Sequence, residues 1–182
     1  MTHQNNSNNL VNNHNSPIKK SKTETAILAC GCFWGTQYWF RKLDGLTDVI
    51  SGYSGGHLEN PKYEQIKTGQ TGHLESVKVV FDPTVINYEQ VIKYYYEIHD
   101  FTQTDGQGYD LGQQYKSAIF YSDETQNKIA LDVKKKLENK GFRVATMILP
   151  FKNFYLAEEY HQNYFSKNLG LPDCHFYKRI WN

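Results

Sequence analysis

The chain has 182 residues, a length that predicts one domain with a sizeable core. Its 20 Lys and Arg residues are balanced by 19 Asp and Glu residues, so the composition shows no basic footprint for nucleic acid. No apolar run in the sequence approaches the length of a membrane span. We therefore expect a protein that binds neither nucleic acid nor a membrane.

The first 22 residues differ in composition from the rest of the chain. They are rich in Asn, Ser and His and contain almost no large apolar side chains. Because such a segment cannot bury enough apolar surface to fold, we expect a disordered tail over residues 1–22 and a folded domain over 23–182. The tail lacks the apolar centre of a secretory signal and the Arg residues of a transit peptide, which favours a cytoplasmic protein.

After the tail, the pattern alternates between strands and helices. Short apolar or alternating runs predict strands, and apolar residues at helical spacing predict helices. Strands are expected over residues 25–31, 48–53, 75–81, 115–121 and 142–149, and helices over 33–43, 88–99, 123–140 and 154–167. The third strand mostly alternates apolar and polar side chains, which indicates that it is half-exposed. The last residues look irregular.

Local signals support two of the helices. Asn87 and Gln90 can form a capping box before the helix over 88–99. The helix over 123–140 is amphipathic, and Gly141 follows it as an expected end.

The order of elements is β-α-β twice, followed by an added helix–strand pair. This order predicts an α+β fold, namely a ferredoxin-like split βαβ two-layer sandwich with a helix–strand extension. Two long loops, 55–72 and 100–114, interrupt the pattern. Loops of this length inside a compact domain are usually functional or disordered, so we expect them to fold over the turn that contains Cys32.

Cys32 lies where a predicted strand turns into a predicted helix. Unpaired backbone N–H groups converge at a helix start, and the helix dipole stabilises a thiolate there. Phe33 and Trp34, which follow directly, can form the wall of a small apolar pocket, and Gly31 and Gly35 flank the motif. The alternative is a buried structural cysteine beside core aromatics. The glycines and the aromatic pair favour a nucleophilic thiol.

The other cysteines are Cys30 and Cys174. An odd cysteine count without a secretory signal argues against a disulfide scaffold and favours catalysis, redox cycling or metal binding. One alternative is a zinc module built from the three cysteines and His175, although their one-residue gaps are atypical. Another is a non-catalytic peptide-binding domain with an aromatic platform. Alternation along a strand would point Cys30 away from Cys32, so we interpret Cys30 as a buried structural thiol.

Several motifs together resemble one known family, the A-type peptide methionine sulfoxide reductases. The matching blocks are Gly31–Gly35, Gly52–Gly56, Asn60–Tyr63, Thr71–Val77, His99–Ser117 and Glu158–Tyr164. They follow one another in the family's order over nearly all of the chain after the tail. Several blocks in one order are far more specific than any single motif. The loop departs from the family pattern at Phe101 and at Asp105-Gly106.

The resemblance implies a role for each of several positions. Cys32 would attack the sulfoxide sulfur, Glu75 would donate a proton to the sulfoxide oxygen, Tyr63 and Tyr115 would hydrogen-bond that oxygen, Asp110 would order the polar side of the pocket, and Phe33 and Trp34 would hold the substrate methyl group. A sulfoxide is a poor electrophile until its oxygen is protonated. A carboxylic acid kept neutral by an apolar site can supply that proton at neutral pH.

The resemblance also implies the reaction cycle. The S epimer of methionine sulfoxide, free or in oxidised proteins, would be reduced to methionine, which repairs oxidative damage. Cys32 would be left as a sulfenic acid, Cys174 would convert it to a disulfide, and thioredoxin would reduce that disulfide. This chemistry uses no cofactor and no metal, and we expect a monomer.

Overall fold

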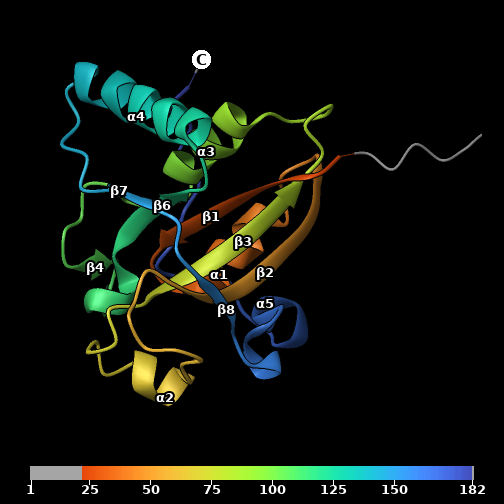
Figure 1. Ribbon diagram of the computed structural model, residues 1–182, viewed down its shortest axis with the longest axis vertical. Helices are drawn as coiled ribbons and strands as arrows, with labels where there is room; N and C mark the ends of the chain where they lie inside the picture. The colour runs from red at the N-terminus through yellow and green to blue at the C-terminus, as the bar shows by residue number, and fades with distance from the viewer. Residues whose placement is uncertain (1–21, 182) are drawn as a thin grey trace, which may run out of the picture.

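The computed structural model describes residues 22–181 (Figure 1). All but the last residue of the predicted tail lies outside this range, so the tail stays a prediction. Within the range, the elements are β1 (Glu24–Cys30), α1 (Phe33–Phe40), β2 (Leu46–Ser54), α2 (Tyr63–Ile66), β3 (Leu74–Phe81), α3 (Tyr88–Glu97), β4 (Gly106–Gln107), β5 (Asp110–Leu111), β6 (Ser117–Tyr121), α4 (Glu124–Asn139), β7 (Met147–Pro150), β8 (Phe154–Leu156) and α5 (Tyr164–Lys167). Short 3-10 turns cover Gln113–Tyr115 and Glu159–His161.

The described residues form a mixed α/β fold around one curled sheet (Figure 1). Its strands follow the order β7-β6-β1-β3-β2-β8. Neighbouring strands are antiparallel, except that β7 runs parallel to β6. The long loop over 100–114 contains its own small ribbon, β4 paired with β5. No helix within residues 22–181 has the length and apolarity that crossing a membrane would need.

The sheet buries apolar side chains on both faces. On one face lies the larger core, where Leu28 belongs to the same cluster as Phe40 of α1, Tyr95 of α3 and Val133 of α4. The other face carries a smaller cluster that includes Ile27. Ile27 and Leu28 join different clusters because successive side chains of a strand point to opposite faces. The strand β1 is therefore apolar and buried from Ala26 to Cys30, and Cys32 follows two residues after its end.

The capping signals predicted from the sequence are confirmed. Asn87 Oδ1 accepts a hydrogen bond from Gln90 N–H at 2.9 Å, and Gln90 Oε1 accepts one from Asn87 N–H at 2.9 Å, so α3 begins with a capping box. Asp123 caps α4 through a 2.9 Å hydrogen bond from Gln126 N–H. Gly141 follows α4 with a φ of +88°, a conformation that favours glycine.

The predicted helix over 154–167 is wrong over most of its length, because only Tyr164–Lys167 is α-helical. Residues Phe154–Leu156 instead form β8, which pairs with the edge of β2 in the register Tyr53 opposite Tyr155. Gly52 permits this pairing, because a Cβ at that position would collide with the Phe154 ring. A short apolar run fits a strand or a buried helix equally well, and the free edge of β2 decides between them.

Two predicted strands also need correction. The strand β3 is not half-exposed at its start, because Glu75 and Ser76 are both buried. It lies in the centre of the sheet between β1 and β2, so both of its edges are paired. The strand β7 is shorter than predicted and covers only Met147–Pro150.

The chain after α5 is irregular, as predicted, but hydrogen bonds attach it to α3. The Glu97 carboxylate accepts hydrogen bonds from the Tyr177 hydroxyl at 3.1 Å and from Ile180 N–H at 2.8 Å. It also accepts one from Trp181 N–H at 3.2 Å. Figure 1 shows the chain crossing the molecule from α5 to reach α3 and α4 at the opposite end. The segment that carries Cys174 is therefore anchored on its C-terminal side.

Candidate active site

Cys32 occupies the turn between β1 and α1, as predicted. Gly31 adopts a φ of +96°, which ends the strand, and Cys32 is the N-cap residue of α1. The Cys32 carbonyl accepts a hydrogen bond from Thr36 N–H at 3.2 Å, and the backbone N–H of Trp34 hydrogen-bonds the Cys32 thiol. The half-buried thiol therefore lies where the N–H groups of the helix start converge.

The protonation state of Cys32 differs from the thiolate that the helix start favours. A hydrogen bond with the Cys174 thiol raises the pKa of Cys32 well above its usual value, and burial raises it further. The Trp34 N–H lowers the pKa, but its effect is smaller. The contact with Cys174 and the loss of water therefore favour the protonated form of Cys32 over the thiolate.

The Cys32 and Cys174 thiols face a pocket of about 210 Å³. The residues that border it are Cys32, Trp34, Gly35, Tyr109, Asp110, Phe165, Pro172, Asp173 and Cys174. They come from the start of α1, the ribbon β4–β5, α5 and the C-terminal segment. The loop over 100–114 therefore reaches the Cys32 turn, as predicted.

Glu75 lies beside Cys32 at the start of β3. Its side chain is buried, with 2% exposed, and its Oε2 accepts a hydrogen bond from Phe33 N–H at 3.1 Å. Burial raises the pKa of Glu75 well above its usual value, the charges of Cys32 and Asp110 raise it further, and the Phe33 N–H opposes them. The carboxyl group is consequently kept neutral, which lets it donate a proton.

Two tyrosines approach the same region from different elements. Tyr63 begins α2, Tyr115 ends the 3-10 turn before β6, and their side chains hydrogen-bond each other. Burial, followed by the charge of Glu75, raises the pKa of Tyr63 to about 12 and also raises the pKa of Tyr115. Both phenols therefore stay neutral at ordinary pH and can donate hydrogen bonds.

The two aromatic residues after Cys32 have different surroundings. Trp34 is half-buried at the pocket, where its ring stacks on Tyr164 at 3.6 Å between centroids and its Nε1 donates to His161 Nδ1 at 2.9 Å. Phe33 is only 1% exposed and packs in the core beside Tyr53 and His161. Trp34 therefore forms part of the pocket wall, whereas Phe33 lies behind the turn.

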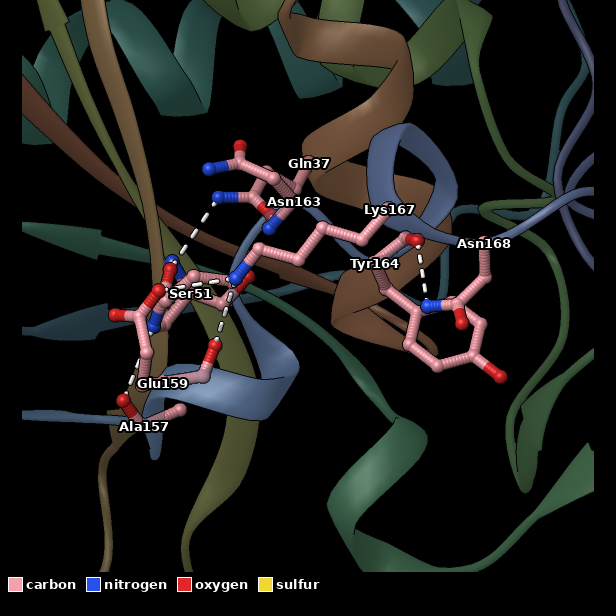
Figure 2. Close-up of polar contacts among 9 residues, drawn as sticks. Gln37, Ser51, Ala157, Glu159, Asn163, Tyr164, Lys167 and Asn168 are labelled. Atoms are coloured by element: carbon pink, nitrogen blue, oxygen red, sulfur yellow. Dashed lines mark hydrogen bonds and ion pairs between the residues drawn. The ribbon is translucent and has the colours of Figure 1, made fainter.

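Amide side chains fix the segment around α5 against β2 and α1 (Figure 2). Gln37 Oε1 accepts a hydrogen bond from Asn163 N–H at 2.7 Å. Gln162 Nε2 donates to the carbonyl oxygens of Ser51 at 2.8 Å and Ala157 at 3.1 Å. These contacts hold the turn that precedes α5 at a fixed place beside the start of α1.

Several residues of the site were missed by sequence reasoning. Glu158 accepts hydrogen bonds from the Tyr53 hydroxyl at 2.7 Å and from Tyr63 N–H at 3.0 Å, so it holds the start of α2 in place. His161 orients Trp34. His175, which the sequence suggested only as a zinc ligand, lies 3.1 Å from the Cys174 sulfur. Glu158 and His161 both lie in the family block over 158–164. The match of that block is the sequence signal that could have indicated them.

Cys30 is buried, as predicted for a structural thiol. Its Sγ lies 3.3 Å from Thr36 Oγ1. In the part of the chain that the structure describes, no group of three or more His, Cys, Asp or Glu side chains is arranged to hold a metal ion. The zinc alternative therefore finds no ligand set among these residues.

Two adjacent thiols at a small pocket, with a buried carboxyl group beside Cys32 and two phenols that interact with that carboxyl group, are typical of a thiol-based oxidoreductase. The family model described as "Peptide methionine sulfoxide reductase" matches residues 24–180. A similar protein is the peptide methionine sulfoxide reductase MsrA of Methanothermobacter thermautotrophicus, which is 47% identical over 151 residues, or 81% of this chain and 89% of the relative. The chain belongs to the A-type peptide methionine sulfoxide reductases, as its motifs predict, and is an oxidoreductase of that family.

Solved structures agree with this assignment. Mxr1 from Saccharomyces cerevisiae in its reduced form is 35% identical and has a TM-score of 0.83, covering 88% of this chain and 94% of its own. Mxr1 in complex with Trx2 is 27% identical and has a TM-score of 0.61, covering 91% of this chain and 97% of its own. The mixed α/β fold is thus shared along most of the chain.

Proposed function

We propose that the protein reduces the S epimer of methionine sulfoxide, free or in oxidised proteins, to methionine. The observation that carries this proposal is the placement of the buried Glu75 carboxyl beside the Cys32 thiol at the start of α1. A neutral acid next to a sulfur nucleophile suits the reduction of a sulfoxide, because protonation of the oxygen makes the sulfur electrophilic.

In the first step, Glu75 protonates the sulfoxide oxygen and the sulfur of Cys32 attacks the substrate sulfur. The thiol proton of Cys32 passes to Glu75 and replaces the proton that Glu75 gave to the oxygen. The hydroxyl group then moves from the substrate sulfur to the Cys32 sulfur, the bond between the two sulfurs breaks, and methionine leaves with Cys32 as a sulfenic acid. The substrate sulfur is reduced and the Cys32 sulfur is oxidised by two electrons. Tyr63 and Tyr115 donate hydrogen bonds to the oxygen and orient it toward Glu75.

The remaining groups position the substrate. Trp34 holds the methyl group against the start of α1, Phe33 packs behind it in the core, and the orientation of Trp34 is supported by its hydrogen bond to His161. Asp110 borders the pocket and orders its polar side. This division places the apolar end of the substrate on the aromatic wall and its oxygen among the donors.

In the second step, Cys174 attacks the Cys32 sulfenic acid, a disulfide forms and water leaves. The hydrogen bond between the two thiols supports this assignment, because the Cys174 sulfur already contacts the Cys32 sulfur. Thioredoxin then reduces the disulfide by thiol–disulfide exchange. The complex of the similar Mxr1 with Trx2 supports a thioredoxin as the reductant.

The finer description of the fold also belongs to this proposal. The strand order β6-β1-β3-β2, with neighbours antiparallel, and the helices α1 and α3 between them support a ferredoxin-like split βαβ core. The strands β7 and β8 extend the two edges of this core. The match of the family model over 24–180 supports a single catalytic domain over 23–182.

The separated S and R epimers of a methionine sulfoxide peptide test the reaction. With dithiothreitol, we expect methionine to form from the S epimer only, and Cys32→Ser to abolish its formation. Methionine from the R epimer would contradict the assigned stereochemistry, and turnover by the serine variant would remove Cys32 as the nucleophile. Binding of the peptide without any methionine would favour the peptide-binding alternative.

A further inference from the structure

His175 is a buried titratable residue that the reaction described above does not use. It follows Cys174 in the irregular C-terminal segment, yet its side chain is only 3% exposed. The imidazole lies between the end of β1 and the start of α1, where it contacts Cys30, Thr36 and Cys174. The His175 ring therefore connects the segment that carries Cys174 to the turn that carries Cys32.

The partners of the two ring nitrogens determine which one carries the proton. Nε2 of His175 lies 2.7 Å from the carbonyl oxygen of Cys30, and a carbonyl oxygen can only accept a hydrogen bond. Nε2 also lies 3.2 Å from Thr36 Oγ1, which donates its own proton to the Cys32 carbonyl at 3.1 Å. Nε2 must therefore be the N–H group, and in the neutral ring Nδ1 keeps a free lone pair.

That lone pair faces the sulfur of Cys174. Nδ1 of His175 is 3.1 Å from Cys174 Sγ, and the Cys174 thiol hydrogen-bonds the Cys32 thiol. Cys174 thus stands between the sulfur that it would attack and a nitrogen that can accept its proton. A nucleophile within hydrogen-bond reach of an oriented base is the arrangement that activates a thiol.

The backbone of the Cys32 motif is shaped to accept this ring. A Cβ added at Gly35 would collide with Nδ1 of His175 and lie 3.0 Å from its Cε1. A Cβ at Gly31 would lie 3.4 Å from the same Cε1 and would collide with Gln107. The two glycines that flank Cys32 therefore leave the space that the imidazole occupies.

We propose that His175 is a catalytic residue of the second step, in which its Nδ1 takes the proton of the Cys174 thiol as Cys174 attacks the Cys32 sulfenic acid. This inference rests on the proposed function. The S–S bond forms while the S–O bond of the sulfenic acid breaks, and the leaving hydroxide takes a proton from the imidazolium to become water. The Cys174 sulfur is oxidised and the Cys32 sulfur is reduced to the disulfide level, so atoms and electrons balance.

The test separates the two steps in time. The protein is mixed with one equivalent of an S-sulfoxide peptide, and the reaction is quenched at intervals. Methionine reports the first step, and the Cys32–Cys174 disulfide, measured by mass spectrometry, reports the second. His175→Asn keeps a hydrogen-bond acceptor near the Nδ1 position but removes the base. We expect methionine to form as in the parent and the disulfide to form about 10²–10⁴-fold more slowly, the usual effect of a general base.

The sulfenic acid of Cys32 should accumulate in this variant and react with dimedone. His73→Asn is the matched control, because His73 is also buried, with Nδ1 accepting from Gly56 N–H at 3.1 Å and Nε2 2.8 Å from the Leu58 carbonyl. We expect the control to form the disulfide at the parent rate. A parent-like disulfide rate in His175→Asn, equal slowing of both steps, or the same slowing in the control would overturn the proposal.

Two further measurements cover the remaining outcomes. If the parent forms no methionine, the proposed function fails, whereas a failure confined to the disulfide rate concerns His175 alone. If His175→Asn does not fold, ¹⁵N NMR of the parent decides, because a neutral ring with its proton on Nδ1 would overturn the proposal. Gly35→Ala, which displaces an intact imidazole, should also slow disulfide formation.

Discussion

At the scale of single residues, the site depends on burial that changes the charge of its groups. Glu75 is close to the backbone N–H of Phe33, which would favour a carboxylate, yet burial prevails and keeps the carboxyl group protonated. Cys32 sits at a helix start, which would favour a thiolate, yet Cys174 and burial prevail there too. Burial therefore favours the protonated form of both groups.

The first prediction concerns Glu75 as the proton donor. Glu75→Gln keeps a hydrogen-bond donor of the same shape but cannot transfer a proton. We expect the rate of methionine formation in a single turnover to fall by about 10²–10⁴-fold, the usual effect of general acid catalysis. Glu59→Gln, which changes an exposed glutamate, serves as the control. Near-normal single-turnover chemistry in Glu75→Gln would show that Glu75 only packs or binds.

At the scale of elements, the proposed second step relies on the C-terminal segment, which carries Cys174. It has no regular structure, but Glu97 of α3 holds its end through three hydrogen bonds. Before Cys174 the chain is largely exposed, with Leu169 and Leu171 facing solvent. The segment is thus anchored after the thiol and largely exposed before it, which leaves Cys174 room to move during the proposed reaction.

The second prediction assigns the resolving thiol. Cys174→Ser should still release about one methionine per enzyme, because the first step needs only Cys32. Its turnover with thioredoxin should collapse, because thioredoxin exchanges with a disulfide. Cys30→Ser should leave both steps largely intact, since the Cys30 side chain is buried in the core. A Cys30–Cys32 bridge in the mass spectrum, or full thioredoxin turnover without Cys174, would overturn this assignment.

The third prediction tests the anchor on α3. Glu97→Ala leaves the N–H groups of Ile180 and Trp181 without their acceptor, which should lower the free energy of unfolding by about 1–3 kcal/mol. The rate of disulfide formation should also fall, because Cys174 is held less firmly. Glu89→Ala on the same helix is the control, and loss of its exposed ion pairs should cost less than about 1 kcal/mol. Equal denaturant midpoints for the two variants would contradict the anchor.

At the scale of the whole molecule, the buried carboxyl group of the site affects stability. The pKa of Glu75 is raised in the folded protein, so above the ordinary carboxyl pKa the unfolded chain loses a proton that the folded chain retains. The unfolded state then binds fewer protons, and the free energy of unfolding falls as pH rises. Below the ordinary carboxyl pKa, both the folded and the unfolded state hold the proton. Glu75 then does not change the free energy of unfolding with pH.

The fourth prediction follows from this decrease in the free energy of unfolding with rising pH. Denaturant unfolding of the parent should show stability decreasing with pH above about 5, with a contribution from Glu75 of up to about 1.4 kcal/mol per pH unit. Glu75→Gln should lose that contribution and become more stable than the parent as pH rises toward neutrality. Glu59→Gln should follow the parent. Parallel stability curves for the parent and Glu75→Gln would mean that the Glu75 carboxyl titrates normally in the folded state.

The sequence by itself determined the features that depend on neighbouring residues. The helix start at Cys32, the capping box of Asn87 and Gln90, and the family blocks are all local patterns, and the structure and the comparisons confirm them. Tertiary structure decided whatever depends on distant partners. Glu75 meets Phe33 across 42 residues, and His175 meets Cys30 across 145. The segment at Phe154 became a strand because β2 offered a free edge, which no local pattern specifies. Burial and long-range contacts set the protonation of the site, and these exist only once the chain is folded.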